Sequence, residues 1–402
     1  MQPNSPRIAL ITGGVPLGGS TTLLCNLGGE LQKRALPHIV LSFEQHNPMH
    51  ADFARLGVNL HLCQNNRLVF EECMRQILKQ LEAFAPTCVV ACLGANSFEV
   101  LRYIPAGITR LGMVQSDEPG LYELLEMYSE WLDGTIGVSR LIAEKLQATP
   151  KLLGKPAHYL TCGIPMDRLN TPREVTDRLA PIRILYLGRL EQEQKRVRLF
   201  PQILAQLQAK NIPFQWTIAG EGSQRAFLER EMQCRGTSSQ VQFTGHVAYA
   251  DVPALLKRHD VYLLASDYEG LPLSLLEAMA CGVVPVVSDL ESGIRDLVSA
   301  STGIAVPVND IDAYADAILQ LHLNRGELHQ KSIAAQQRVA QEFSVEAMTD
   351  RWLTVAKPNQ PEIYPVWKES KILTPIGYEN HFRFTGAGLL LRKLRKRISS
   401  KS

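Results

Sequence analysis

The sequence predicts an α/β protein with two doubly wound parallel-sheet domains, each Rossmann-like, facing each other across a cleft. Short apolar runs alternate with helical segments along most of the chain, which is typical of parallel sheets covered by helices on both faces. The 402 residues are more than one core usually holds. The alternation stops at the stretch 171–181, which carries two prolines, and then restarts. We therefore expect an N-terminal domain at 1–175, a second domain at 176–345, and a crossover helix with a basic tail at 346–402.

Composition describes an ordinary globular protein. Hydrophobic residues make up 45% of the chain and charged residues 20%. No apolar run approaches the roughly 20 residues that a membrane span needs, and the short apolar run at the N-terminus predicts a first strand instead of a signal peptide. The eight cysteines form no Cys-x-x-Cys pair, which favours a reduced, cytoplasmic location.

The elements expected in the first half follow the apolar runs in order. Strands are predicted at 7–12, 37–43, 58–63, 87–93, 109–114, 134–138 and near 157–160, with helices from the first glycine loop to about 34, at 67–85 and at 139–148.

The second half repeats the pattern. Strands are predicted at 182–187, 214–219, 240–244, 260–266, 283–287 and near 303–306, with helices at 195–209, 223–234, 250–258, from 272 to the glycine at 282, and near 310–324, 326–342 and 344–356.

The tail differs from the rest in charge. Residues 366–402 carry a net charge of +7, which leaves −5 on the remainder of a chain whose total is +2. The segment 389–398 is a short basic amphipathic stretch. It can dock on anionic lipid, or it can be a solvated tail or one that packs back as a crossover. The acidic remainder argues against a nucleic-acid partner.

The first glycine loop, Gly13 to Gly19, has the spacing of a phosphate-binding loop, but Gly19 stands where the lysine belongs. A phosphate-loop nucleotidase is therefore not expected. The loop remains either a tight structural turn or a general anion or hydroxyl site at a helix N-terminus.

Two cations follow the strand predicted at 182–187. Arg189 lies at the carboxyl end of this strand and Lys195 at the expected start of the next helix, an arrangement that suits a pyrophosphate. The alternative is a solvated pair that is neutralised by Glu191 or Glu193.

Two carboxylates mark the stretch 260–289, which predicts a strand, a turn, a helix and a second strand. Glu269 lies in the turn and Glu277 within the helix among apolar neighbours. Glu277 has two interpretations: a buried carboxylate that binds ligand hydroxyls, or a residue on the helix surface. Glu269 binds a ligand or simply places negative charge near a helix N-terminus.

Neither of two possible metal-binding patterns predicts a metal site. Asp310, in the pair Asp310 and Asp312, is predicted to cap a helix. His46 and His50 are separated by Pro48, so a helical zinc pair is not expected.

Together these motifs resemble the retaining glycosyltransferases of family 4, which have the glycosyltransferase-B fold. The matching segments run in order from GGVPLGGST through VQSDEPG, CGIPMD, GRLEQEQK, IAGEGSQ and FTGHV to EGLPLSLLEAMACGVVPVVSD, and cover about residues 7–350. The Glu-x7-Glu element with its flanking Gly-Leu-Pro and Ala-Cys-Gly is the specific part.

The resemblance implies a nucleotide-sugar donor held mainly by the second domain, and transfer with retention of configuration without a metal or other cofactor. Arg189 and Lys195 would neutralise the diphosphate, Glu269 would contact the transferred sugar, and these three form the expected catalytic set. Glu277 would accept the ribose hydroxyls. The other donor-binding positions expected are Gly18, Gly19, Gly245, His246, Val247, Gly270, Leu271, Leu273 and Ser274.

One position departs from the family pattern. Gln115 stands where many relatives have a histidine that reaches the donor sugar, and glutamine cannot carry a proton charge. Donor binding can survive this change, whereas sugar preference or catalysis can be altered. The expected acceptor is a glycan, a lipid-linked carbohydrate or a small molecule. The alternatives are an epimerase or a phosphorylase of the same fold, or a non-catalytic subunit that binds the sugar nucleotide.

Overall fold

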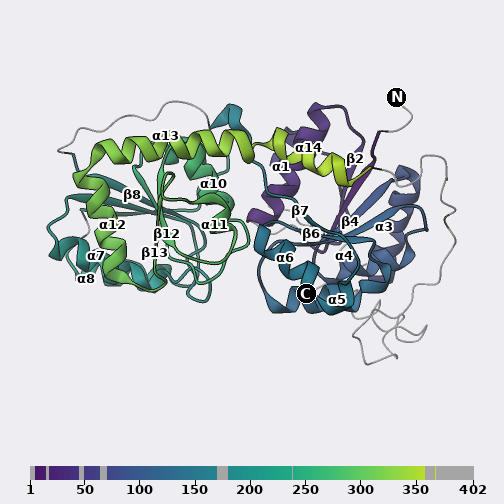
Figure 1. The fold of residues 1–402 in the computed structure, drawn as a ribbon, viewed down its shortest axis with the longest axis horizontal. Helices are drawn as coiled ribbons and strands as arrows, with labels where there is room; N and C mark the ends of the chain where they lie inside the picture. Colours follow the sequence, from purple (N-terminus) through teal and green to yellow (C-terminus); the bar gives the residue numbers. More distant parts are fainter. Residues whose placement is uncertain are drawn as a thin grey trace, which may run out of the picture. The chain divides into compact units, whose positions relative to one another are not determined.

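The computed structural model describes residues 5–14, 18–44, 49–63, 70–169, 180–237, 239–357 and 367, and the chain forms two compact units (Figure 1). Unit 1 comprises Met1–Val138, Ile142–Thr161 and Met348–Ser402, and unit 2 comprises Ser139–Leu141 and Cys162–Ala347. The chain therefore returns to unit 1 after completing unit 2. The linker predicted at 171–181 falls almost entirely outside the described residues and stays a prediction.

Unit 1 contains a seven-stranded sheet in the order β3-β2-β1-β4-β5-β6-β7, and all its strand pairs are parallel. Its strands are β1 Ile8–Thr12, β2 His38–Ser42, β3 Leu60–Leu62, β4 Cys88–Leu93, β5 Thr109–Val114, β6 Gly134–Gly137 and β7 Ala157–Tyr159. Every residue of β1 and β2 is buried, as expected for strands covered on both faces.

The helices of unit 1 connect successive strands. They are α1 Gly19–Lys33, α2 His50–Arg55, α3 Phe70–Phe84, α4 Ala95–Glu99, α5 Pro119–Met127 and α6 Arg140–Ala148. α14, Val345–Val355, adds its side chains from the other end of the chain: Arg34 pairs with Asp350, and Arg351 donates to the Thr161 hydroxyl over 2.8 Å. Trp352 and Met348 of this helix are buried.

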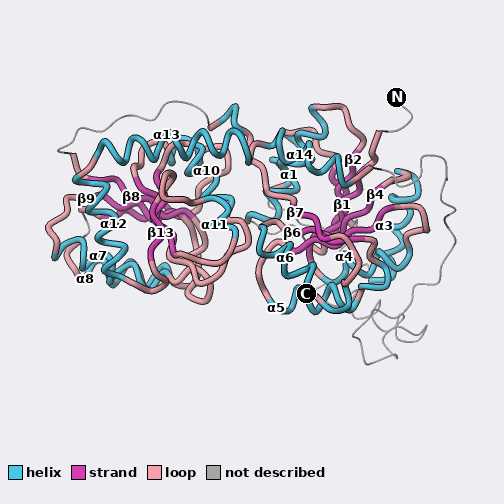
Figure 2. Tube along the Cα trace, viewed as in Figure 1, coloured by secondary structure: helices cyan, strands magenta, loops and turns pink. Residues whose placement is uncertain are grey.

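Unit 2 repeats the same strand order in a six-stranded parallel sheet, β10-β9-β8-β11-β12-β13. Its strands are β8 Ile182–Leu187, β9 Phe214–Ala219, β10 Val241–Gly245, β11 Val261–Leu264, β12 Val284–Ser288 and β13 Ile304–Val306. All residues of β11 and β12 are buried. Within each unit the strands form a central layer that helices cover (Figure 2).

The helices of unit 2 are α7 Phe200–Ala209, α8 Arg225–Cys234, α9 Val252–Leu256, α10 Leu273–Ala280, α11 Gly293–Leu297, α12 Ile311–Leu323 and α13 Arg325–Glu342. Two predicted helix ends are confirmed. The Asp310 side chain accepts from the Ala313 amide over 3.0 Å as the N-cap of α12, and Gly282 follows α10 with a φ of 72°.

One predicted helix start is wrong. Lys195 lies in a turn and does not begin a helix, because Arg196 adopts the left-handed conformation with a φ of 51°. A 3₁₀ turn at Val197–Leu199 follows, and α7 begins at Phe200 with Pro201 in its first turn. The short helices α2, α4, α5 and α11 had no predicted counterpart.

In the part of the chain that the structure describes, no helix is both long and apolar enough to cross a membrane. The basic segment 389–398 and His46 lie outside the described residues.

Candidate functional site

The strand order brings two loops of unit 2 together. β8 lies between β9 and β11. Successive strands are added on one side of β8 as far as β10 and on its other side from β11 onward, so the strand order reverses at β8. Ligands of open parallel sheets bind at the carboxyl ends of the strands where the order reverses. The loop after β8, residues 188–196, contacts the loop after β11, residues 265–272. The Asp267 amide donates to the Gln194 carbonyl over 2.9 Å, which joins the two backbones.

Lys195 and Glu269 form a mostly buried ion pair between these loops. The Lys195 Nζ lies 2.6 Å from Glu269 Oε1, and the two side chains are 13% and 5% exposed. Ser266 Oγ donates to the same carboxylate oxygen over 2.6 Å. The structure therefore joins two of the three predicted catalytic residues directly.

Gln194 connects the third predicted residue to this pair. Arg189 Nη2 donates to Gln194 Oε1 over 2.8 Å, and Gln194 Nε2 lies 3.2 Å from the Tyr268 carbonyl and 3.5 Å from Glu269 Oε2. Arg189 also pairs with Glu191 over 2.9 Å and is 57% exposed. An exposed ion pair contributes about 1 kcal/mol at most, so Arg189 can exchange Glu191 for another anion at little cost.

The next residue holds the turn in an uncommon backbone conformation. Arg196 is in the left-handed region, and its Nε lies 2.6 Å from Asp267 Oδ2. Residues 194, 195 and 196 therefore each contact the loop after β11. Such backbone conformations cost about 1–3 kcal/mol and persist only where the surroundings hold them.

Glycines let backbones approach closely around this edge. A Cβ on Gly220, after β9, would lie 1.9 Å from the Gly188 carbonyl oxygen. A Cβ on Gly293, at the start of α11, would lie 2.1 Å from the Gly270 carbonyl oxygen, to which the Gly293 amide donates over 2.8 Å. Any larger residue at either position would displace a loop of the site.

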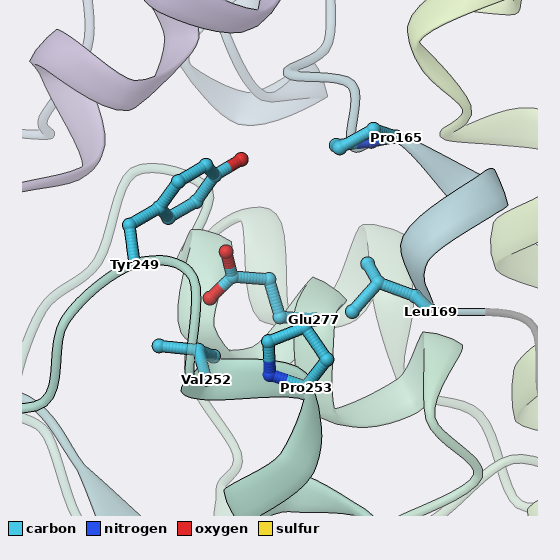
Figure 3. A pocket seen from close by; sticks show the side chains of 6 residues that line it. All are labelled: Pro165, Leu169, Tyr249, Val252, Pro253 and Glu277. Carbon is cyan, nitrogen blue, oxygen red and sulfur yellow. The ribbon is translucent and has the colours of Figure 1, made fainter. Parts of the chain in front are cut away.

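Glu277 projects from α10 on another side of the same edge. Its side chain is 9% exposed and points into a small space of about 10 Å³, about the volume of one water (Figure 3). The other side chains that line this space are those of Pro165, Leu169, Tyr249, Val252 and Pro253. Of the two interpretations left open for Glu277, the structure shows the buried carboxylate and excludes the helix-surface residue, while its binding of ligand hydroxyls stays a prediction.

Tyr262 fixes the start of α10 to the end of β8. Its hydroxyl donates to the Leu187 carbonyl over 3.0 Å and lies 2.7 Å from Ser274 Oγ. Burial raises the pKa of Tyr262, and the charges of Glu269 and Glu277 raise it further, so the phenol stays neutral. The first-turn position of Ser274 therefore depends on a tyrosine that the sequence motifs did not identify.

The remaining donor-binding positions predicted in unit 2 lie in two segments, one at the end of β10 and one at the start of α10. Gly245 ends β10 with a φ of 71°, His246 is exposed and Val247 is half-buried. Gly270, Leu271 and Leu273 are buried before and at the start of α10.

Gly18, Gly19 and Gln115 belong to unit 1. Gly18 caps α1 with a φ of 148°, and Gly19 is its first residue. Gln115 follows β5, where its Nε2 donates to the Cys92 carbonyl over 3.4 Å and lies 3.1 Å from Met113 Sδ.

A pocket of about 370 Å³ opens at the carboxyl ends of β1 and β4 in unit 1. It is lined by Gly13, Gly14, Glu44, Leu93, Gly94, Ala95 and Asn96. Glu44 lies over Gly14, where a Cβ would come within 2.6 Å of its carboxylate. This negative charge makes the first glycine loop a poorer anion site than its spacing suggested.

Several residues of the candidate site were missed in the sequence. Ser266 ends a predicted buried strand and Asp267 directly follows it, and that position alone could have identified them. Gln194 could not have been distinguished from Gln192, because both lie in the run EQEQK. Among the described residues, no group of three His, Cys, Asp or Glu side chains could hold a metal ion.

Comparison with known proteins gives a family match within unit 2. Residues 168–338 match the family model of the glycosyl transferases group 1. Unit 2 is a glycosyl transferases group 1 domain. The predicted resemblance to glycosyltransferases is confirmed at the level of this group, and family 4 stays a prediction.

Relatives and solved structures agree with this assignment. The chain is 31% identical over 218 residues to the amylovoran biosynthesis glycosyltransferase AmsK of Erwinia amylovora, covering 52% of each chain. It is 31% identical over 179 residues to a glycogen synthase of Mycobacterium tuberculosis, covering 44% of this chain and 41% of the relative. The chain thus spans about half the length of the curated relatives it matches.

A solved structure extends the likeness over more of the chain. HepE of Anabaena, crystallised with UDP and glucose, matches 87% of this chain and 99% of its own with a TM-score of 0.72 and 14% identity. At this identity the likeness establishes the fold, and the predicted fold class of two parallel-sheet, glycosyltransferase-B type domains is confirmed.

Proposed function

We propose that this protein is a glycosyltransferase of family 4 that moves a sugar from a nucleotide-sugar donor to an acceptor. The observation that carries the proposal is the position of Arg189, Lys195 and Glu269, which meet where the loops after β8 and β11 join. Two cations and a carboxylate at a sheet switch point suit the phosphates and sugar hydroxyls of one extended ligand.

In this proposal the two cations stabilise the leaving group. As the glycosidic bond to the donor breaks, negative charge grows on the nucleoside diphosphate, and fixed positive charges lower the energy of that state. Each charge-assisted hydrogen bond contributes about 1.5–3 kcal/mol. Because protein cations supply this charge, we propose that transfer proceeds without a metal ion. Retention of configuration is proposed from the resemblance to family 4.

Glu277 and the end of β10 would hold the nucleoside. A buried carboxylate among mainly apolar side chains suits the two hydroxyls of a ribose, and Gly245, His246 and Val247 lie at the neighbouring strand end. Gly270, Leu271, Leu273 and Ser274 would contact the sugar and the phosphates near the start of α10. Gly18, Gly19 and Gln115 of unit 1 stay proposed donor-binding positions.

The acceptor is proposed to be a carbohydrate, free or lipid-linked. AmsK, one of the relatives, is named for the biosynthesis of amylovoran, and such an acceptor suits the resemblance to this group. We also keep as proposals the cytoplasmic location and peripheral membrane contact through the basic tail.

The test is a thermal-shift panel of nucleotide sugars on the wild type and on the double variant Arg189→Ala/Lys195→Ala. We expect one nucleotide sugar to stabilise the wild type and to lose most of this effect in the variant. Equal stabilisation of both proteins would contradict the phosphate assignment, and no stabilisation of the wild type would contradict the donor. Transfer assays with EDTA should match those without it.

A second candidate function is binding of the sugar nucleotide without transfer. Gln115 motivates it, because its amide donates to a backbone carbonyl and cannot act as an acid at the donor sugar. Release of free sugar or formation of a glycoside from the stabilising nucleotide sugar would exclude this candidate.

A further inference from the structure

The charge of Lys195 is already balanced within the chain. Glu269 lies 2.6 Å from its ammonium group, and both side chains are largely shielded from water. Two opposite charges at contact distance cancel most of each other's field, and in partly buried surroundings solvent screens the pair little. An incoming phosphate therefore meets a neutralised lysine with a carboxylate beside it.

Glu269 has further donors that do not depend on Lys195. Ser266 Oγ donates to Oε1 over 2.6 Å, and Gln194 Nε2 lies 3.5 Å from Oε2. Ser266 is fully buried in the loop after β11, and the Gln194 amide is oriented by Arg189 and by the Tyr268 carbonyl. The carboxylate would thus keep polar partners if the ammonium group moved away.

We propose that Glu269 is the internal counter-ion of Lys195, that the donor's diphosphate displaces it, and that Ser266 and Gln194 then hold it toward the sugar. This inference rests on the proposed function, since it takes Lys195 as a phosphate ligand. It gives Glu269 a second role: the carboxylate weakens binding of phosphate alone and favours a ligand that brings both phosphate and sugar hydroxyls.

The direction in which the substitution Glu269→Gln changes anion affinity distinguishes the counter-ion role from simple sugar binding. Glu269→Gln keeps the shape of the side chain and removes its charge, so Lys195 becomes available to an anion. We expect Glu269→Gln to bind inorganic pyrophosphate and uridine diphosphate about tenfold more tightly than the wild type, measured by titration calorimetry. A pure sugar-binding glutamate would leave these affinities unchanged.

Glu231→Gln is the matched control for net charge. Glu231 lies on α8, where it faces Arg235 at 3.9 Å, and it takes no part in the candidate site. Its loss changes the total charge equally, so a gain of the same size in this variant would overturn the proposal. The double variant Lys195→Gln/Glu269→Gln should show no gain, because the freed cation is then absent.

Failure of this inference can be told from failure of the proposed function. If Lys195→Gln binds both anions as well as the wild type, or if no protein binds either anion, the phosphate assignment fails and the inference fails with it. If Lys195→Gln weakens binding but Glu269→Gln gives no gain at an unchanged melting temperature, only the counter-ion role is overturned.

Ser266→Ala tests the positioning part separately. We expect unchanged affinity for pyrophosphate, because the Ser266 hydroxyl donates to the Glu269 carboxylate and not to Lys195, but a several-fold weaker affinity for the complete nucleotide sugar. Loss of both affinities together would indicate a structural role for Ser266 and would contradict its assignment.

Discussion

Lys195 is expected to contribute both to stability and to nucleotide binding. Lys195→Ala would leave Glu269 largely buried without its cation, and breaking one side of such a pair costs about 3 kcal/mol. We expect a loss of this order in urea unfolding, together with loss of nucleotide binding. The double variant Lys195→Ala/Glu269→Ala should recover part of the stability but none of the binding.

Lys210→Ala is the matched control. Its ion pair with Asp316 has the same 2.6 Å separation, but the side chains are 29% and 60% exposed. Exposed pairs contribute little to stability because solvent screens them, so this variant should remain close to the wild type. A similar loss of unfolding free energy in both variants would show that shielding from solvent does not make the Lys195 pair more stabilising than an exposed pair.

His259 predicts how the stability of unit 2 depends on pH. Its Nδ1 lies 2.8 Å from the Leu255 carbonyl, which can only accept, so Nδ1 carries the proton and Nε2 accepts from the Thr217 hydroxyl over 2.8 Å. Burial lowers the pKa of His259 below the ordinary value of 6.5. The folded protein therefore holds this imidazole neutral.

The sign of the effect follows from proton uptake. Below about pH 6.5 the unfolded chain binds a proton at this histidine before the folded protein does, so the free energy of unfolding falls as the pH falls. Above that pH both forms are neutral and the contribution is constant. We expect urea unfolding between pH 8 and pH 5 to show a shallower decrease in His259→Gln than in the wild type. An equal slope would contradict this assignment.

Single residues were predicted from the sequence where a local pattern implied their environment. Burial of Glu277 was one of two interpretations, and it was suggested by the apolar neighbours Leu275, Leu276, Ala278 and Met279. The partner of Lys195 could not be predicted, since Glu191 and Glu193 are near in sequence whereas Glu269 is near only in space. Such pairings depend on which strands are neighbours.

At the scale of elements, the close approach of α11 to the loop after β11 gives a sharp prediction. Gly293→Ala would place a methyl group against the Gly270 carbonyl and Leu271, which must then shift. Overpacking of this kind costs about 2 kcal/mol, so we expect the melting temperature to fall by about 4 °C or more. Nucleotide-sugar affinity should fall too, because Gly270 and Leu271 belong to the candidate site.

Gly120→Ala provides the control in α5. A Cβ there would have no neighbour within 4 Å, and the backbone does not have the positive φ that favours glycine. Alanine is a better helix former than glycine, so this variant should be as stable as the wild type or slightly more stable. Equal destabilisation by the two substitutions would contradict the close-approach argument.

Strand positions were predicted to within a few residues because parallel strands covered on both faces are short apolar runs. The neighbours of each strand were not predicted: nothing in the sequence of β8 says that it pairs with β11 instead of β10. The turn at Lys195 was also missed, because the left-handed conformation of Arg196 has no glycine to mark it. Tertiary contacts with Asp267 hold it there.

At the scale of the whole molecule, the reactivity of the cysteines tests the burial of side chains in both units. All eight lie among the described residues, seven are buried and Cys234 is exposed. Burial raises the pKa of the thiols of Cys88, Cys162 and Cys281 to about 12, so little reactive thiolate forms at neutral pH. We expect one fast-reacting thiol per native chain in a colorimetric thiol titration and eight in denaturant. A second fast thiol would contradict the burial.

Two parallel-sheet domains were expected from the restart of the alternation after residue 181, whereas their common strand order came from the structure. The segment that completes unit 1 was expected as a crossover helix with a basic tail at 346–402, and its described part from Met348 onward belongs to unit 1. The pattern of apolar residues in α14 shows that it has a buried face but does not show which core covers it.

The return of the chain to unit 1 has a consequence for synthesis on the ribosome. Unit 2 can be fully translated while unit 1 still lacks Met348 and Trp352, whose side chains are buried in the finished protein. During that interval the nascent unit 1 exposes the apolar surface that α14 later covers, and it would be a target for chaperones. A gene fragment stopping at codon 347 would still encode the entire group 1 match, yet its product would carry an unfinished first unit.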